Sequence, residues 1–323
     1  MGGNALAKIE ITVRRIESRE RFVEVRERVT RLIGAFYSVV RPCHELAWKE
    51  TFGDIDVLVA DPVRAPFDPT SFGSLGVVRN ANVCSFEFEG HQIDVIEVPA
   101  AAVEMALFVV FGELGMCLGP SLKRMGLKIG LTGLYQRYEV RTLWYDLLLT
   151  RDLGEFLRFV GLEGRPLPYS AGSYREIFDY IKGGNFWYDD TVGTETLDTE
   201  RNKRRRPMYL EFREYCSDPA NAPAQRGDDP WPYDIERNVA FFGKTTEFRE
   251  AMDALNRRDA FRQHFNGHIV GDVTGLCGRE LGAFMRYFLG DDKDGEVREA
   301  LMAMTDAEVR ERLAKAFGEW RKA

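Results

Sequence analysis

Two aspartates lie two residues apart inside an apolar run near the N-terminal end of the chain. In the stretch TFGDIDVLVAD, Asp54 and Asp56 alternate with apolar residues that read as a buried β-strand, from Ile55 to Ala60. Side chains alternate between the two faces of a strand, so both carboxylates are expected on one face. Ionised carboxylates are costly to bury and repel each other at close range. We therefore expect a divalent cation between them.

A third aspartate, Asp94, follows about forty residues later in the apolar stretch HQIDVIEV. If the two strands are neighbours, the three carboxylates converge on one site. Carboxylate oxygens are ligands that Mg²⁺ and Mn²⁺ favour, and two such ions can activate an attacking hydroxyl and hold a leaving pyrophosphate. The pattern predicts metal-dependent phosphoryl transfer. For Asp54 and Asp56 taken alone, a strand-end turn after Gly53 is the alternative.

The segments around these aspartates predict a small sheet with flanking helices. Residues 17–36 carry apolar residues at helical spacing, with Ser18 near the start. Residues 77–89 alternate as a strand and lead into the segment that holds Asp94, and Pro99 opens a further helix.

The second half of the chain has a different pattern. Residues 126–150 contain two further strand-like pieces, and the sequence after residue 151 predicts mainly helices. We expect an α+β fold in which a small mixed or antiparallel sheet with flanking helices precedes a helical C-terminal region. The expected domains are 1–150, which is catalytic, and 151–323, which is helical.

Composition restricts the function classes. The chain has 323 residues, 45% of them hydrophobic and 29% charged, and a net charge of −7. No run approaches the roughly 18 apolar residues of a membrane span, and the N-terminus has no apolar signal region, so we expect a cytoplasmic protein with no membrane partner. The net charge argues against a histone-like nucleic-acid binder, which leaves only a local basic surface for such contacts.

Cysteine and histidine usage argues against zinc and against a disulfide framework. The five cysteines are scattered and form no CxxC pair, which favours reduced thiols. The four histidines form no HExxH motif. His264 and His268 have helical spacing but no evident third ligand, so we expect no zinc site.

The motifs FGDIDVLV and HQIDVIEV together resemble the DNA polymerase β-like nucleotidyltransferase superfamily, over roughly residues 40–100. With MGGNALAK, GLKIGLTGL and RRRPMYLEF added, most of the chain resembles a group of nucleotidyltransferases encoded by tailed phages. The resemblance implies Mg²⁺- or Mn²⁺-dependent transfer of a nucleoside monophosphate from an NTP, expected to be ATP, to a hydroxyl. By this resemblance Asp54 and Asp56 bind both metals, while Asp94 binds the catalytic metal and draws the proton off the acceptor. A phage origin would place the protein in the host cytoplasm.

One departure from the superfamily pattern concerns the residues that contact the triphosphate. Members of the superfamily usually place Gly-Ser or Gly-Gly about ten residues before the first aspartate, where backbone amides cradle phosphates. This chain has no such pair there. Either the N-terminus folds back so that Gly2 and Gly3 supply that loop, or side chains such as Lys49 contact the phosphates. We assign nucleotide contacts to Gly2, Gly3, Lys49 and Gly53. N-terminal disorder and a solvated Lys49 are the alternatives.

The acceptor is predicted from a basic run. Lys203, Arg204, Arg205 and Arg206 lie on an expected helix and form either a phosphate track or a solvated face. We expect an RNA 3′ end as the acceptor, with a small molecule or a protein hydroxyl as alternatives. A module that binds nucleotide without turnover is the remaining possibility. The missing Gly-Ser pair favours it, and the presence of all three carboxylates opposes it.

Overall fold

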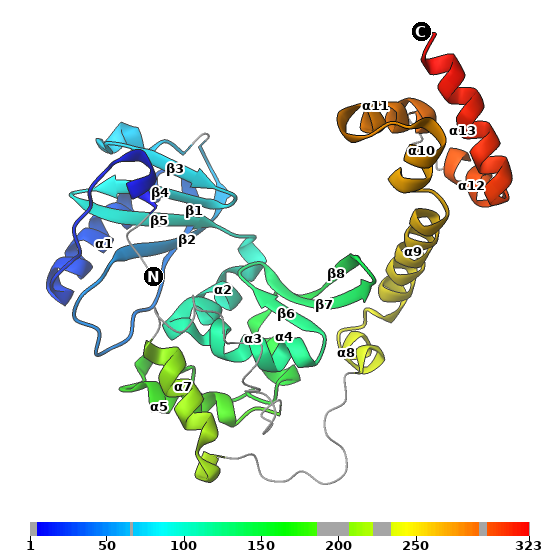
Figure 1. Ribbon diagram of the computed structural model, residues 1–323. Coiled ribbons are helices and arrows are strands. Elements are labelled where there is room, and N and C mark those ends of the chain that lie inside the picture. Colours follow the sequence, from blue (N-terminus) through cyan, green and yellow to red (C-terminus); the bar gives the residue numbers. More distant parts are fainter. Residues whose placement is uncertain (1–4, 65–66, 186–206, 222–233, 291–295, 323) are drawn as a thin grey trace. The chain divides into compact units, whose positions relative to one another are not determined.

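The computed structural model describes residues 5–64, 67–185, 207–221, 234–290 and 296–322 (Figure 1). The chain divides into two compact units. Unit 1 comprises Met1–Arg137 and Asp146–Thr245, and unit 2 comprises Tyr138–Tyr145 and Thr246–Ala323.

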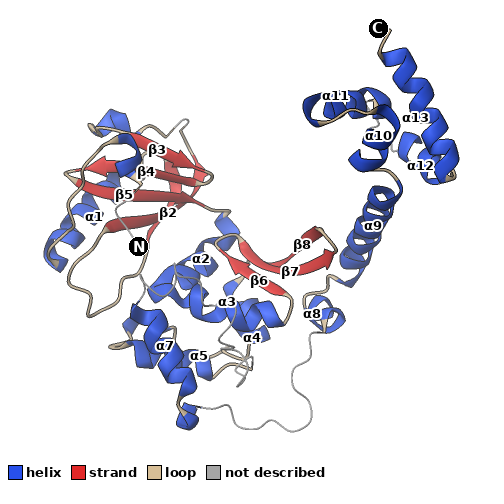
Figure 2. Cartoon of the chain, viewed as in Figure 1, coloured by secondary structure: helices blue, strands red, loops and turns tan. Residues whose placement is uncertain are grey.

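Unit 1 contains a five-stranded sheet of order β1-β2-β5-β4-β3. Its strands are β1 (Tyr37–Pro42), β2 (Asp54–Pro62), β3 (Val77–Asn80), β4 (Val83–Phe88) and β5 (His91–Glu97). Strands β2 and β5 run parallel, and the other neighbours run antiparallel. The mixed sheet, together with its helices and the helical C-terminal region, confirms the predicted α+β class (Figure 2).

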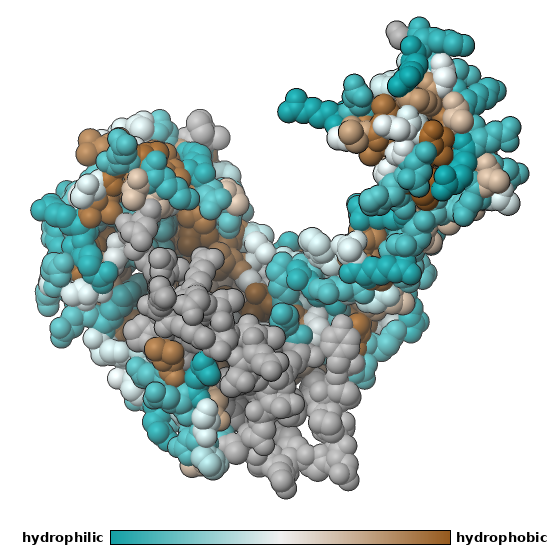
Figure 3. All heavy atoms as spheres, viewed as in Figure 1, coloured by the Kyte–Doolittle hydropathy of each residue, from teal (hydrophilic) through white to brown (hydrophobic). Residues whose placement is uncertain are grey.

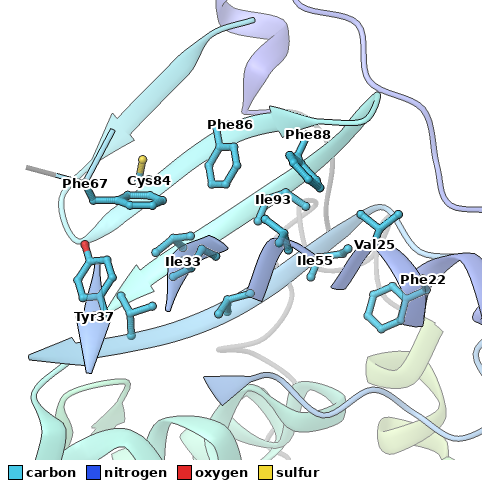
Figure 4. Packing of buried hydrophobic residues seen from close by; sticks show 14 of the residues in the cluster. Phe22, Val25, Ile33, Tyr37, Ile55, Phe67, Cys84, Phe86, Phe88 and Ile93 are labelled. Carbon is cyan, nitrogen blue, oxygen red and sulfur yellow. The ribbon is translucent and has the colours of Figure 1, made fainter. Parts of the chain in front are cut away.

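One face of this sheet is covered by α1 (Arg19–Ile33). The helix begins as its sequence predicts, because the Ser18 side chain accepts a hydrogen bond from the Arg21 backbone N–H. Phe22, Val25 and Ile33 of α1 pack in one cluster with residues of the sheet, Ile55 and Ile93 among them (Figure 4). The odd-numbered residues of β2 and β5 therefore form the core beneath α1.

The even-numbered residues of β2 and β5 face the opposite side. There Leu58, Ala60 and Ile96 form a second cluster with Ala106 and Leu107 of α2 (Val103–Val110). Strand alternation places Asp54 and Asp56 on this same face, at the beginning of β2. The strand is therefore apolar on both faces along most of its length and acidic on one face at its start.

The remainder of unit 1 contains a second sheet and further helices. The strands β6 (Leu127–Gly130), β7 (Gly133–Val140) and β8 (Leu143–Thr150) form a three-stranded sheet in that order. The expectation of two strand pieces in residues 126–150 was wrong, because a turn separates β6 from β7. Gly133 follows that turn with a φ of 139°, and a Cβ atom there would lie 2.6 Å from the Thr150 carbonyl oxygen.

Unit 1 also contains several helices on either side of the second sheet in sequence. Helix α3 (Leu114–Arg124) precedes the sheet, and α4 (Leu153–Phe159), α5 (Tyr174–Lys182), α7 (Pro207–Ser217) and α8 (Ile235–Phe241) follow it. Phe108 of α2 contacts Phe156 of α4 and Tyr180 of α5, with ring centroids 6.1 and 6.2 Å apart. These aromatic contacts join α4 and α5 to α2, so unit 1 continues past residue 150, the domain boundary expected from the sequence.

Unit 2 is helical apart from the tip of the β7–β8 hairpin. Its helices are α9 (Thr245–His264), α10 (Gly267–Thr274), α11 (Gly278–Leu289), α12 (Glu296–Met302) and α13 (Asp306–Trp320). Phe284, Leu301 and Leu313 lie at the centre of their shared core. The hairpin tip is joined to α9 by an ion pair of 2.6 Å between Arg141 and Asp259.

Within the described residues, no single helix has the length and apolar character needed to cross a membrane. The bent pair Ala100–Val110 and Leu114–Lys123 reaches that apolar length only when its two segments are taken together.

The packing of α1 predicts a large difference between two substitutions on this helix. Phe22 is 1% exposed and stacks on Phe52 at 4.0 Å, whereas Leu32 is 36% exposed. Phe22→Ala should lower the free energy of unfolding by about 3–5 kcal/mol, as for other buried aromatics. Leu32→Ala should change it by no more than about 0.5 kcal/mol. Urea unfolding followed by tryptophan fluorescence measures both, and equal losses would contradict the assigned packing.

Candidate active site

The parallel pairing of β2 and β5 brings the three predicted aspartates together. In this register Asp56 lies opposite Asp94, and Asp54 lies opposite Gln92. One carboxylate oxygen from each of Asp54, Asp56 and Asp94 lies within 4.8 Å of the other two. All three residues are partly exposed, so the cluster is accessible from solvent. In the described part of the chain, it is the one group of three or more His, Cys, Asp or Glu residues close enough to share a metal ion.

The electrostatics of the cluster oppose full ionisation. Burial raises the pKa of Asp56 well above its ordinary value, and the negative charges of Asp54, Asp94 and Glu45 raise it further, while Lys49 partly offsets them. Burial also raises the pKa of Asp94. A divalent cation would favour the ionised form of each carboxyl. The donor set is all oxygen and lies on two paired strands, which fits Mg²⁺ or Mn²⁺.

Asp94 is oriented by two neighbouring side chains. The Gln92 amide nitrogen donates to both carboxylate oxygens of Asp94, at 2.9 and 3.1 Å. Ser85 faces Asp94 from the adjacent strand β4, and hydrogen bonds from Ser85 and Gln92 both lower the pKa of Asp94 against the effect of burial. Gln92 and Ser85 are 2% and 4% exposed, so their positions are restrained by packing.

Gln92 also connects the site to the N-terminal segment. Its side-chain oxygen accepts a hydrogen bond of 3.2 Å from the backbone N–H of Ala5, the first described residue. Gly2 and Gly3, to which the sequence assigns phosphate contacts, lie outside the described residues. Ala5 is therefore connected to Asp94 through the side chain of Gln92.

The loop between β1 and β2 carries the other predicted nucleotide contacts. The Lys49 ammonium pairs with Glu45 at 2.5 Å and lies 5.1 Å from the centre of the Phe52 ring. Its positive charge lowers the pKa of Asp56 against the larger effect of burial. Gly53 directly precedes β2 and connects this loop to Asp54.

Arg19 of α1 holds this loop in place. Its guanidinium donates to the carbonyl oxygens of Leu46, Ala47 and Lys49, at 2.6, 3.0 and 2.8 Å. A two-way backbone bridge between Ile16 and Phe52 fixes the end of the loop, with distances of 2.8 and 2.9 Å. The position of Lys49 therefore depends on contacts made by the start of α1.

The structure adds residues that sequence reasoning missed and leaves one predicted cluster undescribed. Gln92, Ser85, Glu45 and Arg19 were not predicted as part of the site. Gln92 had a readable signal, since it is a polar residue two positions before Asp94 on the same strand face. The basic cluster Lys203, Arg204, Arg205 and Arg206 lies outside the described residues.

No protein-family model matches the chain, and a search of curated proteins finds none that is significantly similar to it.

The raised pKa of Asp56 predicts how the metal-free protein responds to pH. A carboxyl that binds its proton more tightly in the folded state destabilises the fold when it ionises. The free energy of unfolding should therefore fall as the pH rises from about 4, the ordinary value for Asp, toward the raised value. Asp56→Asn should reduce this fall and make the metal-free protein more stable at neutral pH.

Asp61→Asn is the matched control for this measurement, because Asp61 is an exposed carboxyl at the other end of β2. Its effect on the free energy of unfolding should stay within about 0.5 kcal/mol. Urea unfolding at several pH values in a chelating buffer compares the variants. A destabilised Asp56→Asn protein at neutral pH would contradict the assigned repulsion.

The two hydrogen bonds from Gln92 predict a role in ion affinity. Gln92→Glu keeps an acceptor for the Ala5 N–H but replaces the donor to Asp94 with a repelling oxygen. Gln92→Met removes both functions at similar volume. Loss of a partner that orients a metal ligand costs about 10–100-fold in metal affinity, so Gln92→Met should weaken Mn²⁺ binding by that factor in a calorimetric titration.

The Mn²⁺ affinity of Gln92→Glu shows whether ion binding depends on the orientation of Asp94 or only on the number of carboxylates. If ion affinity depended on the number of carboxylates alone, Gln92→Glu would bind Mn²⁺ more tightly than the parent protein. We expect weaker binding, because the new carboxyl lies against Asp94 in the position of its hydrogen-bond donor.

Proposed function

We propose that this chain is a metal-dependent nucleotidyltransferase of the DNA polymerase β-like superfamily. It would transfer a nucleoside monophosphate from an NTP, with ATP as the expected donor, to a hydroxyl acceptor and release pyrophosphate. The observation that supports this most directly is the convergence of Asp54, Asp56 and Asp94 within 4.8 Å on two parallel strands. Burial and the negative charges of Asp54 and Asp94 raise the pKa of Asp56, so the crowded cluster destabilises the metal-free fold, which argues against a purely structural role.

Asp54, Asp56 and Asp94 would together hold the divalent ions. When bound, the ions supply charge stabilisation for the triphosphate and for the attacking and leaving oxygens. Asp94 would also accept the proton of the acceptor hydroxyl, and the hydrogen bonds from Gln92 and Ser85 fix its orientation for this role.

Lys49 would contact the triphosphate. Its ammonium is held near the cluster by Glu45, on a loop whose carbonyl groups are fixed by Arg19. Gly53 offers backbone close to Asp54 without a side chain. A contribution from Gly2 and Gly3 remains part of the proposal, supported by the hydrogen bond between Ala5 and Gln92.

The acceptor is proposed to be an RNA 3′ end. The support is the run of cations from Lys203 to Arg206, which could follow a phosphate backbone in a chain of net charge −7. A small-molecule or protein hydroxyl remains the alternative acceptor. The same chemistry at the triad of Asp54, Asp56 and Asp94 would serve all three kinds of acceptor.

The test incubates the protein with Mg²⁺ and labelled NTPs together with separate RNA, protein and metabolite fractions. We expect label on RNA, its loss to background in Asp54→Asn and Asp94→Asn, and full retention in Asp61→Asn. Label on protein or metabolites alone would overturn the RNA acceptor. Label that persists in the Asp54 and Asp94 variants would overturn the assigned site.

A binding module without turnover gives a different result. In that case no fraction takes up label, and calorimetry detects ATP binding that does not depend on the triad. For the enzyme we expect ATP binding that requires Mg²⁺ and is lost in Asp56→Asn.

A further inference from the structure

Unit 2 contains a groove of about 1090 Å³ that the proposed chemistry does not use. One wall is a face of α9, where lining residues recur at helical spacing from Ala254 to Phe265, about 16 Å at 1.5 Å per residue. The other walls come from α11 and α12. The lining residues are Ala254, Arg257, Arg258, Ala260, Phe261, Arg262, Phe265, Asn266, Gly267, Met285, Leu289, Arg298, Glu299 and Met302.

The floor of the groove is apolar and includes two methionines. Met285 and Leu289 are one turn apart on α11, and Met302 of α12 is 42% exposed. In the space-filling view, apolar side chains reach the surface of unit 2 over α10 to α12 and are bordered by hydrophilic ones (Figure 3). Methionine adapts its shape to different apolar partners, which is why it recurs in grooves that bind helices.

The aromatic rings of the floor are engaged within unit 2. Phe265 is 2% exposed and stacks on Phe288 at 5.5 Å. Phe261 packs on Phe265 at 5.5 Å, and the Arg298 guanidinium lies over its ring at 5.9 Å. Stacked nucleobases need free ring faces, so this floor is better suited to aliphatic side chains than to single-stranded RNA.

The rim of the groove is basic. Arg257, Arg258 and Arg262 are exposed on α9, and within the described residues none of them forms an ion pair. Arg298 adds a fourth cation, and Glu299 is the one acidic residue of the lining. This local excess of positive charge contrasts with the net charge of −7 for the whole chain.

We propose that this groove binds an acidic amphipathic helix of a partner protein. Apolar side chains of the partner at positions i, i+4 and i+7 would enter the Phe-Met-Leu floor, as in other helix-in-groove complexes. Its acidic side chains would pair with Arg257, Arg258 and Arg262 along α9. Ala254 and Ala260, both small and exposed, leave space beside these arginines. This inference does not depend on the proposed transferase activity.

The test uses the full chain and a labelled model peptide of about 15 residues, a length that can form a helix. The peptide carries Leu along one face and Glu elsewhere. Fluorescence anisotropy should show saturable binding that weakens with added salt. A scrambled peptide with the same composition, and a peptide with Lys in place of Glu, should bind at least about tenfold more weakly, a difference of about 1.4 kcal/mol.

Variants of the full chain locate the binding. Arg257→Glu with Arg258→Glu, and separately Met302→Asp, should each weaken the acidic peptide at least about tenfold. The matched control is Arg279→Glu with Arg286→Glu, two exposed arginines of α11 outside the groove lining, which should leave the affinity unchanged. Circular dichroism confirms that each variant is folded, and Arg257→Lys with Arg258→Lys should retain most of the binding.

Three outcomes would overturn the proposal. The first is that the acidic peptide fails to bind. The second is that it binds equally to the parent protein and to both groove variants. The third is that labelled single-stranded RNA competes for the groove and loses affinity in the Arg257 and Arg258 variant while Met302→Asp has no effect, which would identify a nucleic-acid surface instead.

Discussion

Parallel pairing of β2 and β5 holds three carboxyl groups closer together than they would lie in solution. Much of unit 1 can be understood from that constraint. One carboxylate oxygen from each of Asp54, Asp56 and Asp94 lies within 4.8 Å of the other two, and burial together with the charges of Asp54 and Asp94 raises the pKa of Asp56. The strands cannot separate to relieve this, because their other residues lie in apolar cores on both faces. The free energy of core packing therefore maintains a site that is electrostatically unfavourable without a cation.

The side chains that contact Asp94 restrict its movement and are uncharged. Gln92 and Ser85 contribute neutral hydrogen bonds to Asp94, and Lys49 is already paired with Glu45. Arg19, which could have compensated a carboxylate, instead donates to three backbone carbonyls of the adjoining loop. Within the described residues Asp56 and Asp94 form no ion pair, which is the arrangement expected of a preorganised metal site.

Features of the site that lie within one strand or one helix end could be predicted from the sequence. Contacts between distant segments could not. Alternation alone places Asp54 and Asp56 on one strand face, and the helix cap at Ser18 follows from residue type. The proximity of Asp94 needs the pairing of β2 with β5, which alternation does not specify and the family resemblance supplied. The contacts of Arg19 with the loop and of Gln92 with Ala5 join residues 27 or more positions apart, and they depend on how α1 and the N-terminal segment pack. The extent of unit 1 was likewise missed, because aromatic contacts such as Phe108 with Phe156 cannot be read from composition.

The two units differ in the charged side chains that they hold together. Unit 1 clusters carboxyl groups, and unit 2 exposes arginines. Unit 1 keeps partly buried carboxyls close together on paired strands, which suits chemistry at a fixed point. In unit 2, Arg257, Arg258 and Arg262 are exposed on α9 and form no ion pair within the described residues, and they lie beside methionines that can repack. Long exposed side chains lose conformational entropy when they are ordered, so they favour a partner that supplies several contacts at once. A rigid acidic site and an adaptable basic groove are therefore suited to different ligands, a small multiply charged one in unit 1 and an extended amphipathic one in unit 2.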